Sequence, residues 1–577
     1  MSVEERLRVP IGSAPAWSTA PGSRRVLVVA HTVTALTRLL DILPLLESDP
    51  RVQVVFTRAR TSNFREGVTE FLGDIGAVVA PWEQAVEEEF DLALSASYGD
   101  DLHRIKAPMV VFSHGAGYNK LAKPETAGAP AAELPHKDEA VFGLSRQTLL
   151  RDGALVPQTL VLSHSEQLDR LNAACPEAVD AALVAGDPTY DRVLAGLPWR
   201  ERYRDHLETG RRRLVLISST WGPTSLLGRW PDLPVRLVEE LPVDEYRVAL
   251  VLHPNVWHGH GPWQVRAWLA DAERAGLRVL PPRQGWQAAL VAADHVVGDH
   301  GSVTFYGAAL GTHTILGAFP HHEMASDSPI AAFGRTAALL RPDAPLLSQI
   351  VEDSEEHTAG RFAETTRMLT SVPGKSGALL RSAFYRILDL PEPAHEVRVT
   401  PPDPPVPHRR GWPDTAGCAP LLATAEEEDG GIRVTRHPAE PAVTGRLSLR
   451  RPHTVTHADE PQTRWRDAAD VVVCGPDRGD PWRRIAEALE AHPGARLLAA
   501  AVDGDDCLVG DRAALRHRLS PEEGARDVDP AVFASAFWRL RRDPGVQAAG
   551  TGPAEGLVFT VLVGDRSVRV RVAREPP

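Results

Sequence analysis

The stretch HVVGDHGSVTFYGAALG, residues 295–311, decides the fold class of this chain. It starts as a short apolar run, turns at glycines and continues into a segment of small residues that suits a closely packed helix. A continuous apolar run of this kind is typical of a parallel strand, which is buried on both faces and followed by a crossover helix. The stretch therefore predicts an α/β domain.

Similar apolar runs lie on both sides of this stretch, and helical segments separate them. They are LVLISST at 214–220, YRVALVLHP at 246–254, LRVLPP at 277–282 and HTILGAF at 313–319. Strands that alternate with helices indicate βαβ units on a parallel sheet. We predict that residues 211–390 form one doubly wound, Rossmann-like domain.

The same rhythm is present earlier in the chain. The apolar runs there are RRVLVVA at 24–30, VQVVFT at 52–57, LALSAS at 92–97, PMVVFSH at 108–114, TLVLSH at 159–164 and AALVAG at 181–186. Residues 24–195 are therefore predicted to form another doubly wound domain, after an N-terminal tail at 1–23.

The last third of the chain has a different character. Prolines crowd the stretch TPPDPPVPHRRGWP at 400–413, which predicts a semi-rigid linker, and we assign 391–465 to this linker and an irregular segment. Residues 466–577 mix helical and strand patterns and end in a predicted hairpin that turns at Gly564. They predict a small accessory α/β or α+β domain, whose role the pattern does not indicate.

The composition is that of a multidomain protein folded in water. The 577 residues are too many for one core, and 43% are hydrophobic and 24% charged. The formal charge of -13 argues against nucleic acid as a partner. No apolar run approaches about 18 residues and the start lacks a signal pattern, so we expect no transmembrane segment and a cytoplasmic location.

Open α/β sheets bind ligands at the carboxyl ends of their strands. In the first predicted domain, VVFSHGAGYNK at 110–120 places His114 directly after an apolar strand and before glycines. An imidazole there could remove the proton of an acceptor hydroxyl, whereas the alternative is a histidine that caps a helix or fills a loop. Asp187 and Asp191 are less favoured candidates for this role and are expected to anchor the turn between the domains.

In the second predicted domain, the helix that starts near Ser302 would direct backbone N–H groups and hydroxyls toward a diphosphate. Asp299 lies in the preceding turn, and Arg283 and Trp286 would lie near a base. The predicted binding residues are Thr220, His253, Arg283, Trp286, Asp299, Gly301, Ser302, Val303 and Thr304. The alternative is an ordinary glycine-serine helix cap beside a structural histidine.

Several cofactor classes lack their sequence signals. No G-x-G-x-x-G follows the first strand, and no G-x-x-x-x-G-K-[ST] occurs in the chain. The histidines His258, His260, His321 and His322 do not have the spacing of a zinc motif. We expect no cofactor and no catalytic divalent metal, because backbone N–H groups and hydroxyls can stabilise the diphosphate charge.

Two Rossmann-like halves with a phosphate-binding helix in the second resemble the GT-B glycosyltransferases and their sugar-nucleotide 2-epimerase relatives. Six short motifs between about residues 24 and 390 resemble, in order, those of the CDP-glycerol glycerophosphotransferases, the teichoic-acid polymerases. They are HGAGYNK at 114–120, LSHSEQLDRL at 162–171, AGDPTYDRVL at 185–194, SSTWGPTS at 218–225, LHPNVW at 252–257 and GDHGSVTFYGAALG at 298–311. The chain departs from that family where His300 and Gly301 replace a tyrosine and a serine, and where Lys120 is the single lysine of its motif.

The resemblance implies a transferase of glycosyl or glycerophosphate groups, in cell-envelope or natural-product glycan synthesis. Its donor would be a nucleotide-activated sugar or polyol, and a hydroxyl acceptor would attack that donor. Two alternatives stay open: a UDP-sugar 2-epimerase-like enzyme, and a catalytically degenerate protein that binds a nucleotide or a partner.

Overall fold

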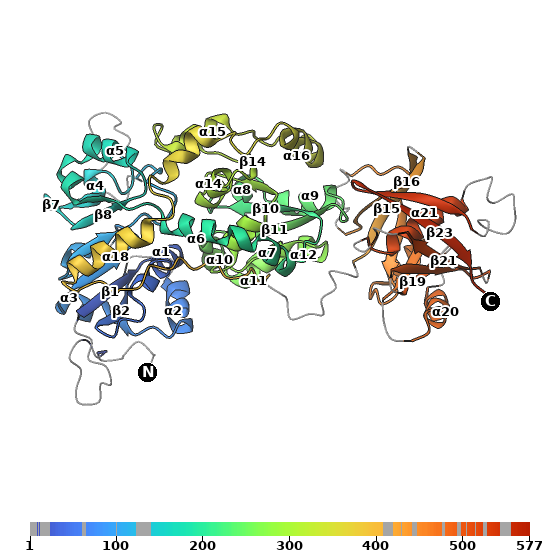
Figure 1. The fold of residues 1–577 in the computed structure, drawn as a ribbon, viewed down its shortest axis with the longest axis horizontal. Coiled ribbons are helices and arrows are strands. Elements are labelled where there is room, and N and C mark those ends of the chain that lie inside the picture. The colour runs from blue at the N-terminus through green and yellow to red at the C-terminus, as the bar shows by residue number, and fades with distance from the viewer. Residues whose placement is uncertain are drawn as a thin grey trace.

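The chain forms three domains arranged in a row, with the second domain in the middle (Figure 1). The computed structural model describes residues 8–9, 11, 24–60, 65–99, 101–122, 140–407, 419–428, 430–440, 447–475, 479–492, 498–503, 505–513, 515–522, 525, 528–542 and 556–576. Within the described part of the chain, no helix combines the length and the apolar character needed to cross a membrane.

The first domain is built on a seven-stranded parallel sheet of order β3-β2-β1-β4-β5-β8-β9. Its strands are β1 (Arg24–Ala30), β2 (Val52–Arg58), β3 (Val79–Ala80), β4 (Leu92–Ser95), β5 (Met109–Val111), β8 (Thr159–Leu162) and β9 (Ala182–Val184). The helices that follow its strands include α1 (Val33–Leu40), α2 (Arg65–Asp74), α3 (Trp82–Glu87) and α5 (Glu166–Ala174). The strand order reverses between β1 and β4, which is where such sheets bind ligands.

The second domain repeats this topology in a five-stranded parallel sheet of order β12-β11-β10-β13-β14. The strands are β10 (Arg213–Ser219), β11 (Tyr246–Leu252), β12 (Arg278–Val279), β13 (His295–Gly298) and β14 (His313–Leu316). The helices include α8 (Leu226–Arg229), α9 (Leu233–Glu240), α10 (Pro254–His260), α11 (Pro262–Trp268), α12 (Ala270–Arg274), α13 (Trp286–Ala292), α14 (Ser302–Ala309), α15 (Pro329–Thr336) and α16 (Leu346–Glu355). The predicted fold class, two doubly wound Rossmann-like domains, is confirmed.

Two helical segments cross between these domains. Helices α6 (Pro188–Gly196) and α7 (Arg200–His206) place Tyr190 and Tyr203 in the core of the second domain. In return, α18 (Ser376–Ile387) places Leu380 and Phe384 in the core of the first domain, where it lies across the sheet (Figure 1). The predicted domain limits of 195 and 390 were wrong in this respect, because an apolar stripe shows that a helix is covered but not which sheet covers it.

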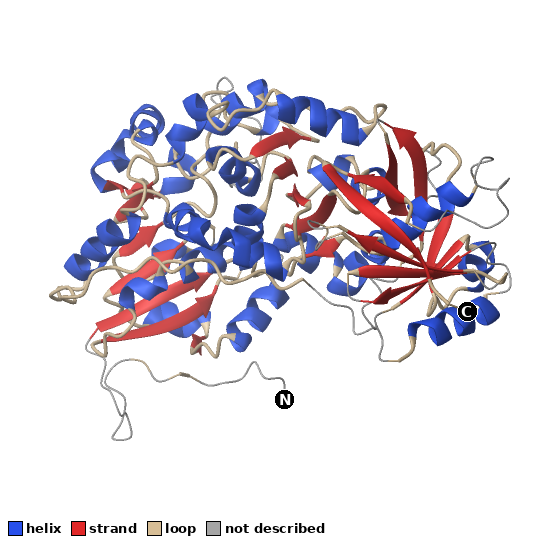
Figure 2. Ribbon diagram, turned by 45° about the vertical axis from the view of Figure 1, so that its right-hand side comes forward, coloured by secondary structure: helices blue, strands red, loops and turns tan. Residues whose placement is uncertain are grey.

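The third domain is a closed nine-stranded barrel (Figure 2). Its strands are β15 (Leu421–Glu428), β16 (Gly431–Pro438), β17 (His453–His457), β18 (Val471–Cys474), β19 (Leu498–Asp503), β20 (Asp506–Gly510), β21 (Arg516–Pro521), β22 (Val558–Val563) and β23 (Arg566–Arg574). Helix α21 (Ala531–Arg541) is buried around most of its circumference and shares one core with all nine strands, whereas α20 (Pro481–Ala491) packs on β18 to β20. A helix that is apolar all round belongs inside a core.

The barrel starts earlier in the chain than the sequence predicted. Strands β15, β16 and β17 lie within 391–465, which we had assigned to a linker and an irregular segment. The run from Ile432 to Thr435 does alternate between apolar and polar residues, as a half-buried strand should. Its nearness to the proline-rich stretch hid this signal, so that part of the prediction was wrong.

The barrel docks on the second domain through a buried arginine. Arg436 of β16 pairs with Asp244 at 2.6 Å and with Asp529 at 2.7 Å, and its guanidinium is almost fully buried. The backbone N–H of Val243 donates to the carbonyl of Arg436 at 2.9 Å, and His437 is hydrogen-bonded to the carbonyl of Glu239. Buried and paired charges of this kind hold the barrel in one orientation.

Candidate functional site

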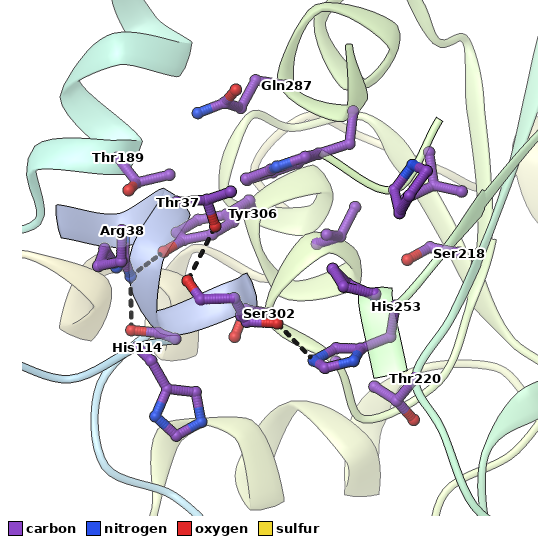
Figure 3. Close-up of a pocket in the computed structure, with 18 of the residues that line it drawn as sticks. Thr37, Arg38, His114, Thr189, Ser218, Thr220, His253, Gln287, Ser302 and Tyr306 are labelled. Carbon is purple, nitrogen blue, oxygen red and sulfur yellow. Dashed lines mark hydrogen bonds between the residues drawn. The ribbon is translucent and has the colours of Figure 1, made fainter. Parts of the chain in front are cut away.

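A cavity of about 410 Å³ lies between the two α/β domains, at the carboxyl ends of both parallel sheets (Figure 3). The first domain contributes residues of α1 and of the turn after β5. The second contributes the ends of β10 and β11 and the turn from β13 into α14. Both topological switch points therefore open into one cavity, which is the position expected for a ligand in folds of this kind.

The N-terminus of α14 meets the first domain directly. The backbone N–H of Ala116 donates to Ser302 Oγ at 2.9 Å, and Gly301, the N-cap residue, supplies no side-chain cap. A Cβ on Gly115 would lie 2.6 Å from Ser302 Oγ, and one on Gly301 would lie 2.7 Å from Thr220 Cγ2. A side chain at either position would therefore require Ser302 or Thr220 to move.

Asp299 lies beneath the cavity and organises its floor. Its carboxylate accepts hydrogen bonds from both the N–H and the hydroxyl of Thr220, and from the N–H groups of Leu226 and Gly301, at 2.7–3.0 Å. It is fully buried, and this burial raises its pKa. Asp299 therefore shapes the turns around a ligand instead of contacting the ligand.

His253 connects the two domains. Its Nδ1 accepts from the backbone N–H of Asn255 at 3.1 Å, so the proton of the neutral ring is on Nε2, which donates to Thr34 Oγ1 at 3.2 Å. Burial and the nearby charge of Lys120 lower the pKa of His253 to about 3. The ring is therefore neutral at pH 7, and both of its nitrogens are occupied.

His114 has a different environment, although it lines the same cavity. Its side chain is exposed to the cavity, and its ring is hydrogen-bonded to the backbone of Ala96, which acts to raise its pKa. Enclosure by the walls of the cavity and the charges of Lys120 and Arg38 outweigh this bond and lower the pKa to about 4. Water in the cavity screens part of this effect, but the direction makes His114 a neutral imidazole at pH 7.

Arg38 is a central residue of the site that the sequence reasoning missed. Its guanidinium pairs with Asp187 at 2.9 Å and donates to the carbonyl of Gly115 at 2.7 Å. It also donates to the hydroxyl of Tyr306 at 2.8 Å (Figure 3). The Tyr306 hydroxyl in turn donates to Asp187 at 2.7 Å. This buried network joins α1, the His114 turn, the start of α6 and helix α14.

Trp286 and Arg283 line the cavity where the sequence placed a base. The indole of Trp286 stacks on Tyr306 with ring centroids 5.9 Å apart and planes 20° apart. Arg283 pairs with Glu70 at 3.1 Å and with Asp74, both in α2 of the first domain. Arg283 therefore joins the domains, and Trp286 is the better surface for an aromatic base.

The structure brings most of the predicted site residues together. The predicted residues that line the cavity are His114, Thr220, His253, Arg283, Trp286, Gly301, Ser302 and Val303, whereas Asp299 and Thr304 are buried behind it. Asp187 and Asp191 anchor the crossing segments, Asp191 through the N–H groups of Gly374 and Ser376. A signal for the missed residues exists, because Thr34 and Arg38 are four positions apart on the first helix after β1 and so share one face.

The described side chains offer little for a metal ion. Among them, no group of three or more His, Cys, Asp or Glu residues is arranged to hold one.

No protein-family model and no curated protein matches the chain. Solved structures similar to it include the wall teichoic acid polymerase TagF, with 11% identity, a TM-score of 0.43 and coverage of 63% of this chain and 89% of that chain. Another is UDP-GlcNAc 2-epimerase from Neisseria meningitidis bound to UDP-GlcNAc, with 13% identity, a TM-score of 0.37 and coverage of 63% and 100%. The S. aureus MnaA–UDP co-structure has 10% identity, a TM-score of 0.37 and coverage of 64% and 97%. These similarities are too weak to indicate a function, which has to be argued from the cavity itself.

Proposed function

We propose that the chain is a nucleotide-diphosphate-dependent transferase that moves a glycosyl or glycerophosphate group to an acceptor hydroxyl. The observation that carries this proposal is the juxtaposition of His114 and the N-terminus of α14 across one cavity. The turn that carries His114 contacts Ser302 through the N–H of Ala116. A histidine from one domain and a helix N-terminus from the other thus line the same cavity, where the first could act as a base and the second could bind an anion.

The donor diphosphate would lie against the first turn of α14. The N–H groups of a first turn have no partner within their own helix, and the helix dipole favours negative charge there. The N–H of Ala116 and the hydroxyl of Ser302, which now bond each other, would both donate to a phosphate oxygen. Lys120 lines the same cavity and adds positive charge, so these groups together can stabilise a departing nucleotide.

His114 would act as the general base. The acceptor oxygen forms a bond to the anomeric carbon or to the transferred phosphorus, while the bond from that atom to the departing nucleotide oxygen breaks. The acceptor proton passes to the imidazole and then to water. A ring whose pKa is about 4 is a weak base, but the negative charge of a bound diphosphate would raise that pKa by offsetting Lys120 and Arg38.

The replacement His114→Ala tests this assignment. It should lower turnover by about 10²–10⁴-fold, the usual contribution of a positioned base, and leave the affinity for nucleoside diphosphates nearly unchanged. The control is His206→Ala, which removes an exposed histidine that does not line the cavity.

Nucleotide release, measured with and without acceptors, separates the candidate functions. Release that requires an acceptor supports a transferase, whereas release from UDP-sugars without any acceptor indicates epimerase-type elimination. Binding without release under all conditions would contradict catalysis, and unaltered transfer by His114→Ala would contradict the role of this residue.

A further inference from the structure

The wall of the cavity includes a residue from the segment of the chain that leads toward the barrel. We call residues 400–406, TPPDPPV, the proline strap. Its carbonyl groups at Thr400 and Pro402 accept hydrogen bonds from Arg192 Nε at 3.1 Å and from the Tyr203 hydroxyl at 2.7 Å. The strap is therefore attached to helices α6 and α7, although no helix or strand includes it.

The strap also packs against the turn that precedes Trp286. Gly285 has a φ of 85°, and a Cβ there would lie 3.0 Å from the Cα of Pro405. Pro402 and Pro405 are buried, whereas Asp403 between them is exposed and lines the cavity. Because prolines restrict the backbone on both sides, the Asp403 backbone is held at this rim and has little conformational freedom to lose when a ligand binds.

The side chains that line the cavity together with Asp403 suit different parts of a nucleoside. Trp286 offers an aromatic face, and the amides of Gln284 and Gln287 can both donate and accept, which suits the edge of a base. An ionised carboxylate only accepts, so its best partners are hydroxyl groups. A ribose presents two adjacent hydroxyls, and Asp or Glu is the side chain that binds them in other Rossmann-type sites.

We propose that Asp403 is a specificity-determining residue that binds the ribose hydroxyls of the donor nucleotide. This inference rests on the proposed function and deepens it, since it predicts ribonucleotides as the substrate class. It also makes the segment leading to the barrel a part of the binding site.

The test compares ribonucleotides with their 2′-deoxy forms by isothermal titration calorimetry. The probes are CDP, UDP, GDP and ADP, each with its 2′-deoxy counterpart, on the full chain. The unaltered protein should bind its preferred ribonucleotide about tenfold more tightly than the deoxy form, as expected for a hydrogen bond to a charged group. Asp403→Ala should weaken binding of the ribonucleotide by about the same factor and abolish the preference.

Two further variants make the result specific. Asp403→Asn keeps one acceptor oxygen and should retain an intermediate preference, whereas Asp343→Ala removes an exposed aspartate outside the cavity and should change nothing. A preference that survives in Asp403→Ala, or its absence in the unaltered protein, would overturn the inference alone. Failure of all four nucleotides to bind would overturn the proposed function, and the inference with it.

Discussion

Two of the histidines that line the cavity, His253 and His114, differ in the hydrogen bonds that their ring nitrogens make. Both nitrogens of His253 are bonded, to Asn255 and to Thr34, so its role is to connect the domains. His114 is bonded to the backbone of Ala96 and its side chain faces the cavity. When a neutral imidazole donates its N–H to a carbonyl, its other nitrogen is unprotonated and carries a lone pair. This is the form that a general base needs.

The pH dependence of transfer should reflect His114. The base acts when neutral, so kcat/KM should fall as the pH drops through the lowered pKa of about 4 in the free protein. The limb in kcat should lie at higher pH, because the bound diphosphate raises the pKa. Measurements of kcat and kcat/KM between about pH 3.5 and 9 check this. Coincident limbs for both parameters would contradict a base next to the diphosphate.

Ser302 tests the position of the diphosphate. Ser302→Trp should reduce the affinity for CDP or UDP by more than about tenfold, because a large side chain covers the first turn of α14. The control Ser302→Ala removes only the hydroxyl and should have a smaller effect. Calorimetry measures both, and unchanged affinity in Ser302→Trp would place the diphosphate elsewhere.

At the scale of elements, the crossing helices join the two α/β domains in both directions. Helix α18 belongs to the core of the first domain although it follows the whole second domain in sequence. Its Tyr385 donates to Asp49 at 2.9 Å, and Asp49 is also held by Arg51, which lowers its pKa. The first domain is thus completed only when the second has been synthesised.

Phe384→Ala should therefore destabilise the first domain. The side chain is fully buried, and removal of such a ring costs about 3–5 kcal/mol. Leu379→Ala, on the exposed side of the same helix, should cost much less. Hydrogen exchange of β1 amides, followed by mass spectrometry, reports on the domain in question, and equal protection in both variants would refute this packing.

At the scale of the whole molecule, the barrel contacts the second domain on the side away from the first (Figure 1). The charged contact between them is the pairing of Arg436 with Asp244, and Asp529 of the barrel holds the same guanidinium. Through the proline strap, the chain that leads to the barrel nevertheless reaches the cavity between the other two domains. The barrel is therefore linked to the cavity through the proline strap and to the second domain through the ion pair of Arg436.

Arg436→Met should loosen the barrel without unfolding it. The change leaves the mostly buried Asp244 carboxylate without its partner, which should weaken this interface, and small-angle scattering should show a larger radius of gyration. Arg539→Met removes an exposed pair with Glu427 and should leave the shape unchanged. Nucleotide affinity should be the same in both variants, because the proline strap keeps its own contacts. An unchanged radius of gyration in Arg436→Met would contradict the role of Arg436 in docking the barrel.

Local patterns in the chain were sufficient to predict the two parallel sheets and the turn at Gly301, because a strand buried on both faces and a glycine-to-helix turn each leave a signal within a few residues. They also predicted His114 and Ser302 as site residues, since strand ends are where such sheets bind ligands. The meeting of Thr34 with His253, 219 positions away, and of Arg38 with Tyr306, 268 positions away, left no such signal. Periodicity reports how each element is covered, but contacts between two domains depend on how those domains are oriented, and here the crossing helices and the pairing at Arg38 determine that orientation.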